Sequence, residues 1–150
     1  MNKKMIKLID ILNEGKQVGI LYHFTDDYGL EGILESNQLL ASTTNANHVS
    51  LTRDKRGWHV GVADNIARIS LDGNAISNNY KISPYAWEES DRGTGGTESE
   101  EAVLINKIDN IKKYITSILI NGKVANILGI DINYIESLLK ENNIKYEISK

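Results

Sequence analysis

The most informative apolar stretch of the sequence is short and ends abruptly on polar residues. Residues 18–25 have the β-branched and aromatic bias of a buried strand, and the run finishes on His23, Phe24 and Thr25. Such a strand delivers its last polar side chains to one edge of a sheet. When a helix begins directly afterwards, this edge is a common setting for an anionic ligand.

The residues that follow predict that helix. Asp26, Asp27 and Gly29 supply turn chemistry, and either aspartate can cap the free amides of a first helical turn. Leu30 and the apolar residues after it then fall on one helical face. The pattern indicates a helix that runs to about residue 36.

Period-two and period-3.6 patterns predict the other elements along the chain. Helices are expected over 3–14 and 131–140, and extended segments over 37–40, 48–54, 60–63, 66–71, 77–82, 102–105, 114–120 and 144–148. Turns are expected at Asp72-Gly73 and at Asn121-Gly122, and Ser83-Pro84 should end the strand before it.

Strands outnumber helices in this pattern and are not regularly separated by them. The fold expected is therefore α+β, with a mixed or mostly antiparallel β core and flanking helices. The length of 150 residues fits a single domain over 1–150.

Composition narrows the chemistry. The chain has no cysteine, which excludes disulfides, thiolate nucleophiles and cysteine-ligated zinc and is compatible with a cytoplasmic location. We expect no membrane segment, because no apolar run approaches the ~20 residues that a span needs. The formal net charge of −3 argues against a general polyanion binder, although a local basic groove remains possible.

Three separated stretches could supply one site. They are His23 to Thr25, Arg53 after an alternating strand, and the glutamates at 98–101 ahead of another strand. An arginine fork suits a pyrophosphate, and a histidine with a hydroxyl suits a ribose or an amide. A fixed carboxylate opposite them would stabilise positive charge on a ribose and accept a proton from a nucleophile.

Each stretch also has a simpler interpretation. His23 could be a hydrogen-bonded core histidine, Arg53 could form a surface ion pair with Asp54 or a neighbour, and the glutamates could belong to a solvated loop. Trp58 could be a lid, a stacking residue or a packing element. The three histidines show no helical ligand spacing, so no metal site is expected, and neither a phosphate-binding glycine loop nor a nucleophile elbow is present.

Taken together and in order, the three stretches resemble the ADP-ribosyltransferase superfamily, closest to its DarT-like branch. Tyr22-His-Phe-Thr25 with the following Leu30-Glu-Gly-Ile-Leu34 resembles the histidine-x-threonine strand and helix of that branch. Arg53 stands where the family carries an NAD-contacting arginine, and residues 98–105 resemble its catalytic glutamate ahead of an apolar strand.

The resemblance implies a split β core with NAD bound between two small sheets, release of nicotinamide and transfer of ADP-ribose, without a metal. It implies that His23 and Thr25 hold the nicotinamide ribose and amide and that Arg53 holds phosphate at the catalytic centre. Glu101 would be catalytic, with Glu100 as the second choice. Tyr22, Phe24 and Leu30 belong to the implied NAD-binding set.

The implied acceptor is a nucleic-acid base or a nucleotide. The loop 87–97 occupies the position of the acceptor-recognising loop, with Trp87, Arg92 and the adjacent Glu98 as its candidate residues. A toxin or a phage-encoded effector would fit this activity in the cytoplasm of a bacterial or infected host cell, and an antitoxin or defence-protein partner stays open. The alternatives are a non-catalytic module that captures a nucleotide-type ligand or a protein, and more remotely an RNA phosphotransferase.

Overall fold

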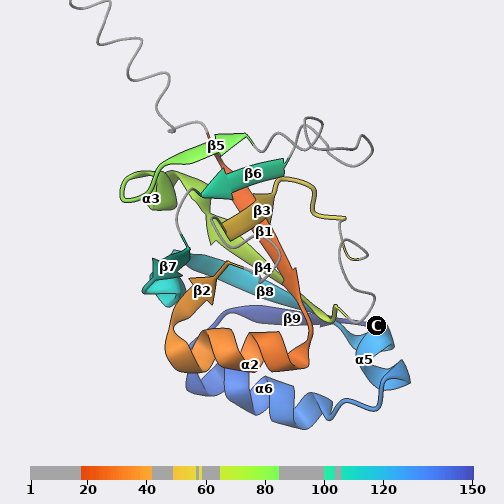
Figure 1. The fold of residues 1–150 in the computed structure, drawn as a ribbon. Coiled ribbons are helices and arrows are strands. Elements are labelled where there is room, and N and C mark those ends of the chain that lie inside the picture. Colours follow the sequence, from red (N-terminus) through yellow and green to blue (C-terminus); the bar gives the residue numbers. More distant parts are fainter. Residues whose placement is uncertain (1–17, 42–48, 57, 59–64, 85–99, 104–105) are drawn as a thin grey trace, which may run out of the picture.

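The structure is a computed structural model of the chain that describes residues 18–41, 49–56, 58, 65–84, 100–103 and 106–150. The helix expected over 3–14, the strand over 60–63 and the loop over 87–97 lie outside these residues. The described elements confirm an α+β fold with a mixed sheet and flanking helices (Figure 1).

Seven strands form the main sheet, in the order β5-β6-β3-β1-β4-β8-β9. The strands are β1 (Ile20–Thr25), β3 (Val49–Thr52), β4 (Ala67–Asp72), β5 (Ile82–Pro84), β6 (Glu100–Val103), β8 (Ile115–Asn121) and β9 (Tyr146–Ser149). Neighbours are antiparallel except for β8 and β9, which are parallel.

A separate two-stranded sheet joins β2 (Gln38–Leu40) to β7 (Lys107–Asp109). The helices are α2 (Asp27–Ser36), α3 (Gly73–Ser77), α5 (Gly122–Ile127), α6 (Ile132–Glu141) and the short 3-10 helix η2 (Ile111–Tyr114). The described strands thus fall into a large sheet and a small one.

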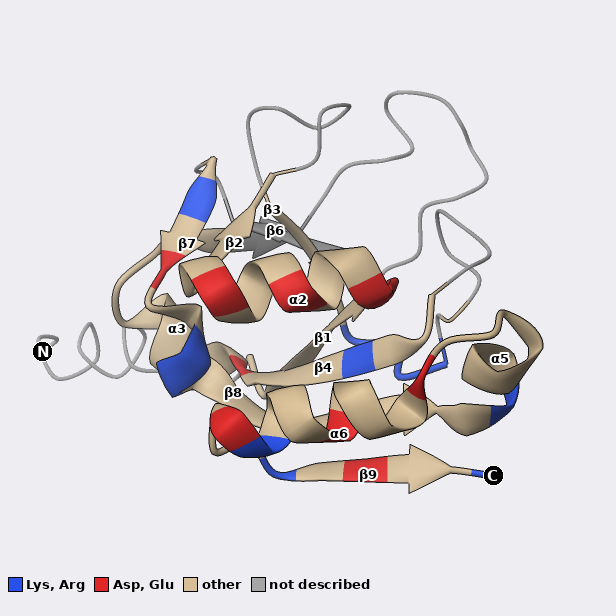
Figure 2. Cartoon of the chain, turned by 90° about the horizontal axis from the view of Figure 1, so that it is seen from below, with Lys and Arg blue, Asp and Glu red and all other residues tan. Residues whose placement is uncertain are grey.

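Two helices pack side by side on the main sheet. Figures 1 and 2 show α2 and α6 next to each other, and the Tyr134 hydroxyl of α6 donates a hydrogen bond to Glu31 Oε2 of α2 at 2.5 Å. The apolar residues of both helices join one core with the sheet, namely Leu30, Ile33, Leu34, Ile135, Leu138 and Leu139. Burial of these side chains is the main force that holds the helices in place.

Alternation along the central strands defines two faces of the sheet. Leu21 and Thr25 of β1 and Ile69 of β4 are buried on the face that carries the core. Tyr22, Phe24 of β1 and Arg68 of β4 occupy the intervening positions and are partly exposed. We call the face with Leu21, Thr25 and Ile69 the core face, and the face with Tyr22, Phe24 and Arg68 the outer face.

The predictions of turns at Asp72-Gly73 and at Asn121-Gly122 were wrong, because each pair begins a helix. Asp72 caps α3 by accepting a hydrogen bond from the Ala75 amide, and Asn121 caps α5 by accepting one from the Val124 amide. The same short polar side chains favour a helix start as much as a turn, and the packing of the following segment decides between the two.

Several strand boundaries also differ from the expectation. Residues 77–81 are not a strand, because α3 extends to Ser77 and β5 begins only at Ile82. β5 includes Ser83 and ends at Pro84, which the sheet tolerates because β5 is an edge strand and needs no hydrogen-bond donor on its outer side. β6 begins at Glu100, so Glu100 and Glu101 belong to the strand and do not precede it.

Candidate functional site

The three predicted stretches lie on three neighbouring strands. β1 carries His23 and Thr25, β3 leads to Arg53, and β6 contains Glu101, and these strands are adjacent in the order β6-β3-β1. Figure 1 shows β6 and β3 beside β1, the central strand of the main sheet. Segments 78 positions apart in the chain therefore lie two strands apart in one sheet.

The strand register places position 101 in the row of His23. Tyr22 pairs with Thr52, so the antiparallel register brings His23 level with Leu51, which in turn pairs with Glu101. Since each strand step is about 4.8 Å, the backbones of His23 and Glu101 lie about 10 Å apart with one strand between them. The row contains Leu51, which is 1% exposed, and therefore belongs to the core face.

Position 100 belongs to the neighbouring row. Glu100 pairs with Thr52, Thr52 with Tyr22, and Tyr22 with Ser70. Because successive residues of a strand alternate between faces, position 100 shares the outer face with Tyr22. The register thus separates the two candidate glutamates, with only position 101 on the face of His23 and Thr25.

His23 has an uncharged imidazole at neutral pH. Burial of the ring lowers its pKa from 6.5 to about 4, and a hydrogen bond to the backbone of Ser50 in β3 offsets part of that effect. A neutral ring that donates to a carbonyl through one nitrogen has a lone pair on the other. His23 is therefore a core-facing histidine that retains hydrogen-bonding capacity for a ligand.

Thr25 lies where β1 meets the first turn of α2. The residue is 8% exposed, and its carbonyl accepts a hydrogen bond from the Ile66 amide at 2.9 Å. Asp26 is the N-cap of α2, because its Oδ1 accepts from the Gly29 amide at 2.8 Å. This confirms that an aspartate caps the helix directly after the strand.

Arg53 begins a turn that side chains stabilise locally. The Asp54 amide donates to Thr52 Oγ1 at 3.0 Å, and the Arg56 amide donates to Asp54 Oδ1 at 2.9 Å. Arg53, Lys55 and Arg56 are exposed on this turn. The exposed ion pair of Arg56 with Asp54, at 3.4 Å, contributes little to stability.

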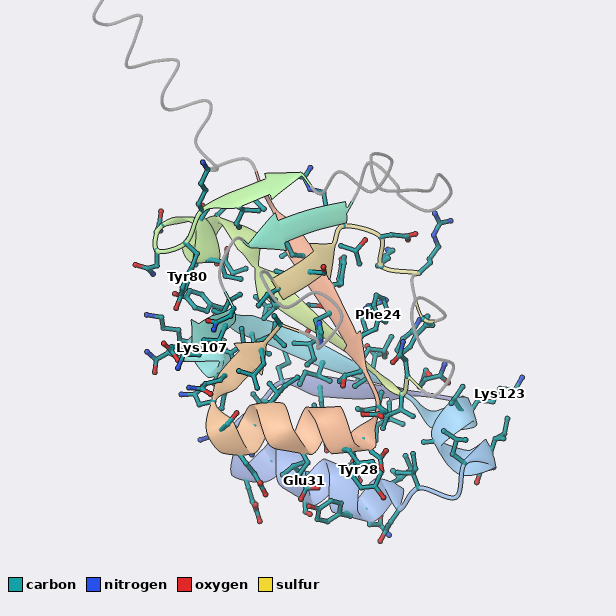
Figure 3. The ribbon with its side chains drawn as sticks, viewed as in Figure 1. Phe24, Tyr28, Glu31, Tyr80, Lys107 and Lys123 are labelled. Atoms are coloured by element: carbon teal, nitrogen blue, oxygen red, sulfur yellow. The ribbon has the colours of Figure 1, made fainter. Side chains whose placement is uncertain are left out.

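The segment after Arg53 packs onto the outer face. Arg68 donates from Nη1 to the Lys55 carbonyl at 3.1 Å and stacks over the Tyr22 ring, 5.2 Å from its centroid. Phe24, near the end of β1 in Figure 3, meets Trp58 edge to face with ring centroids 5.1 Å apart. Trp58 is therefore a packing residue that closes the Arg53 turn against β1.

Solved structures with this fold include two complexes of one protein. "Thermus sp. 2.9 DarT in complex with NAD+" matches with a TM-score of 0.55 and 12% identity, covering 91% of this chain and 96% of that chain. The complex of the same protein with carba-NAD+ gives 0.54 and 11% over the same shares. The protein shares the fold of DarT. No protein-family model matches the sequence, and no curated protein matches it significantly.

The residues that the sequence resemblance implied for NAD binding lie in different environments of this fold. His23 and Thr25 share the core face, whereas Tyr22 and Phe24 lie on the outer face. Leu30 is completely buried, so its side chain supports the helix and is not accessible to a ligand. Trp87, Arg92 and Glu98, the candidate acceptor residues, lie outside the described part of the chain.

Two residues with roles around the site carried weak signals in the sequence. Arg68 holds the Arg53 turn, and its only signal is a cation inside an apolar strand. Gly29 adjoins Thr25, and its signal is a glycine in the first turn of a helix where glycine is unfavourable. Among the described residues, no helix could cross a membrane and no cluster of three His, Asp or Glu side chains could hold a metal.

Proposed function

We propose that the protein is an NAD-dependent mono-ADP-ribosyltransferase that releases nicotinamide and transfers ADP-ribose to a nucleic-acid base or nucleotide. The observation that carries the proposal is the row that joins His23 to position 101 on one face of a fold shared with an NAD-bound DarT. His23 and Thr25 would hold the nicotinamide ribose and amide, and Arg53 would hold a phosphate.

The chemistry requires one fixed carboxylate. As the bond between nicotinamide and the ribose anomeric carbon breaks, its electron pair leaves with neutral nicotinamide and positive charge develops on the ribose. Glu101 would stabilise that charge and accept the proton of the acceptor group that forms the new bond to the anomeric carbon. The neutral His23 suits this reaction because it adds no positive charge beside the ribose.

The test is incubation of the protein with labelled NAD and a panel of DNA, RNA, nucleotide and protein acceptors. Free nicotinamide and label on an acceptor are expected. NAD binding without either product would support a non-catalytic binding module in place of the transferase. Failure of NAD to bind at all would contradict the transferase and leave a module that captures another nucleotide-type ligand or a protein partner.

Charge distribution supports a polyanionic acceptor. The turn over residues 53–56 carries three cations and one carboxylate, although the whole chain has a formal charge of −3. By contrast, Asp27, Glu31 and Glu35 make α2 acidic, as the red bands on that helix in Figure 2 show. Phosphates would therefore approach from the side of the Arg53 turn.

Reversing the two exposed charges Lys55→Glu and Arg56→Glu should lower transfer to a nucleic-acid acceptor about tenfold at low salt, because each lost phosphate contact weakens binding. Nicotinamide release from NAD in water should change little. The acceptor titration should be repeated at increasing salt, where the difference between the proteins should shrink.

The matched control is Lys107→Glu with Lys113→Glu, the same charge change on another surface. In Figure 3, Lys107 lies on the left side of the molecule, whereas Phe24, whose ring contacts Trp58, lies right of the centre. Equal loss of transfer in both double variants would indicate a general charge effect and contradict an acceptor site at residues 53–56.

The role in a toxin or phage-encoded effector is a further proposal that depends on the acceptor found.

A further inference from the structure

Helix α2 contains two glycines, Gly29 and Gly32, although glycine destabilises a helix relative to alanine. Neither has a positive φ, so backbone conformation does not require glycine at either position. A Cβ at Gly32 would meet no atom within 4 Å. A larger residue therefore fits at Gly32, whereas the surroundings of Gly29 leave no space for one.

A Cβ at Gly29 would collide with the Thr25 hydroxyl oxygen, closer than real Cβ atoms approach any neighbour. It would also lie 3.3 Å from Thr25 Cβ and 3.1 Å from Asp26 Oδ1. The space that a side chain would fill at position 29 is already occupied by the hydroxyl of Thr25. Glycine at this position is thus explained by its contact with the end of β1.

Neither partner can move away easily. The Gly29 amide donates to Asp26 Oδ1 at 2.8 Å, and the Leu30 amide donates to the Asp26 carbonyl at 3.0 Å, which holds the first turn against the strand. On the other side, the Thr25 carbonyl accepts from the Ile66 amide, which holds the end of β1. An added methyl group must therefore rotate the Thr25 side chain or push α2 away from β1.

We propose that Gly29 is a positioning residue for Thr25. By leaving space beside the strand, it sets the orientation in which the Thr25 hydroxyl meets the nicotinamide end of NAD. The ligand in this inference rests on the proposed function, whereas the contact between Gly29 and Thr25 does not. Gly29 acts only through Thr25 and need not touch the ligand.

The first experiment compares NAD binding by Gly29→Ala and Gly32→Ala in calorimetry. Both changes add one methyl group to the same helix. We expect about tenfold weaker NAD binding for Gly29→Ala, since a small displacement of a positioning group is costly, and unchanged binding for Gly32→Ala. Equal affinity of the two variants would overturn the proposal.

The second experiment measures the packing without NAD, through the thermal unfolding midpoints of Gly29→Ala, Thr25→Ala and the double variant. Removing the Thr25 hydroxyl should relieve the collision, so the double variant should unfold at a higher temperature than Gly29→Ala alone. Additive shifts would overturn the proposal. If Gly29→Ala does not fold, recovery of folding in the double variant supports the proposal and its failure to recover overturns it.

The two experiments separate the inference from the proposed function. If the wild type does not bind NAD but the unfolding midpoints of the single and double variants are not additive, the proposed function is contradicted and the packing of Thr25 on Gly29 stands. NAD binding by the wild type with additive midpoints would overturn the positioning role and leave the proposed function intact.

Discussion

Glu101→Gln is expected to lower the rate of nicotinamide release and of ADP-ribose transfer about 10³-fold, because the variant keeps the shape of the side chain but loses its charge and its basicity. The affinity for NAD should change far less than the rate, since the carboxylate acts on charge that develops only in the transition state. The measurements are initial rates with labelled NAD and calorimetric binding of NAD.

Glu100→Gln provides the matched control, as an identical chemical change one residue away. The register puts position 100 in the row of Thr52 and Tyr22 on the outer face, and position 101 in the row of Leu51 and His23. Glu100→Gln should therefore keep its rate within an order of magnitude of the wild type. A larger loss in Glu100→Gln than in Glu101→Gln would refute the assignment of the catalytic carboxylate.

The stability of the protein should fall on acidification because of His23. Its pKa is about 4 in the folded protein and 6.5 when unfolded, so the unfolded state binds the proton more tightly. The stabilisation is fully present above pH 6.5 and is lost as the pH falls toward 4. Between pH 7 and pH 5 the free energy of unfolding should drop by about 2 kcal/mol through this group.

Urea unfolding at both pH values, for the wild type and for His23→Gln, isolates that contribution. The other titrating groups are common to the two proteins and cancel in the difference between them. The variant should be less sensitive to pH by about 2 kcal/mol over this range. The same pH dependence in both proteins would mean that His23 is not desolvated in the folded state.

Local sequence signals were sufficient for the elements that enclose the site. The apolar run before Thr25 predicted β1, an aspartate followed by a helical apolar pattern predicted α2, and residue periodicity predicted α6. These signals are reliable because both the spacing of apolar residues and the capping hydrogen bonds depend on residues only a few positions apart. At Asp72 and Asn121 the same local chemistry favoured turns as well as helices, and no local signal distinguished the two.

By itself, the sequence determined which residue types were present, where strands would end on polar groups, and that these groups resembled an ADP-ribosyltransferase site. Only the tertiary structure decided which strands pair, and therefore that His23 and Glu101 occupy one row while Glu100 belongs to the other face. Strand register depends on contacts between segments far apart in the chain, and shifting it by one residue exchanges the two faces. For the same reason, the contact that makes Gly29 necessary beside Thr25 became visible only after α2 had packed against β1.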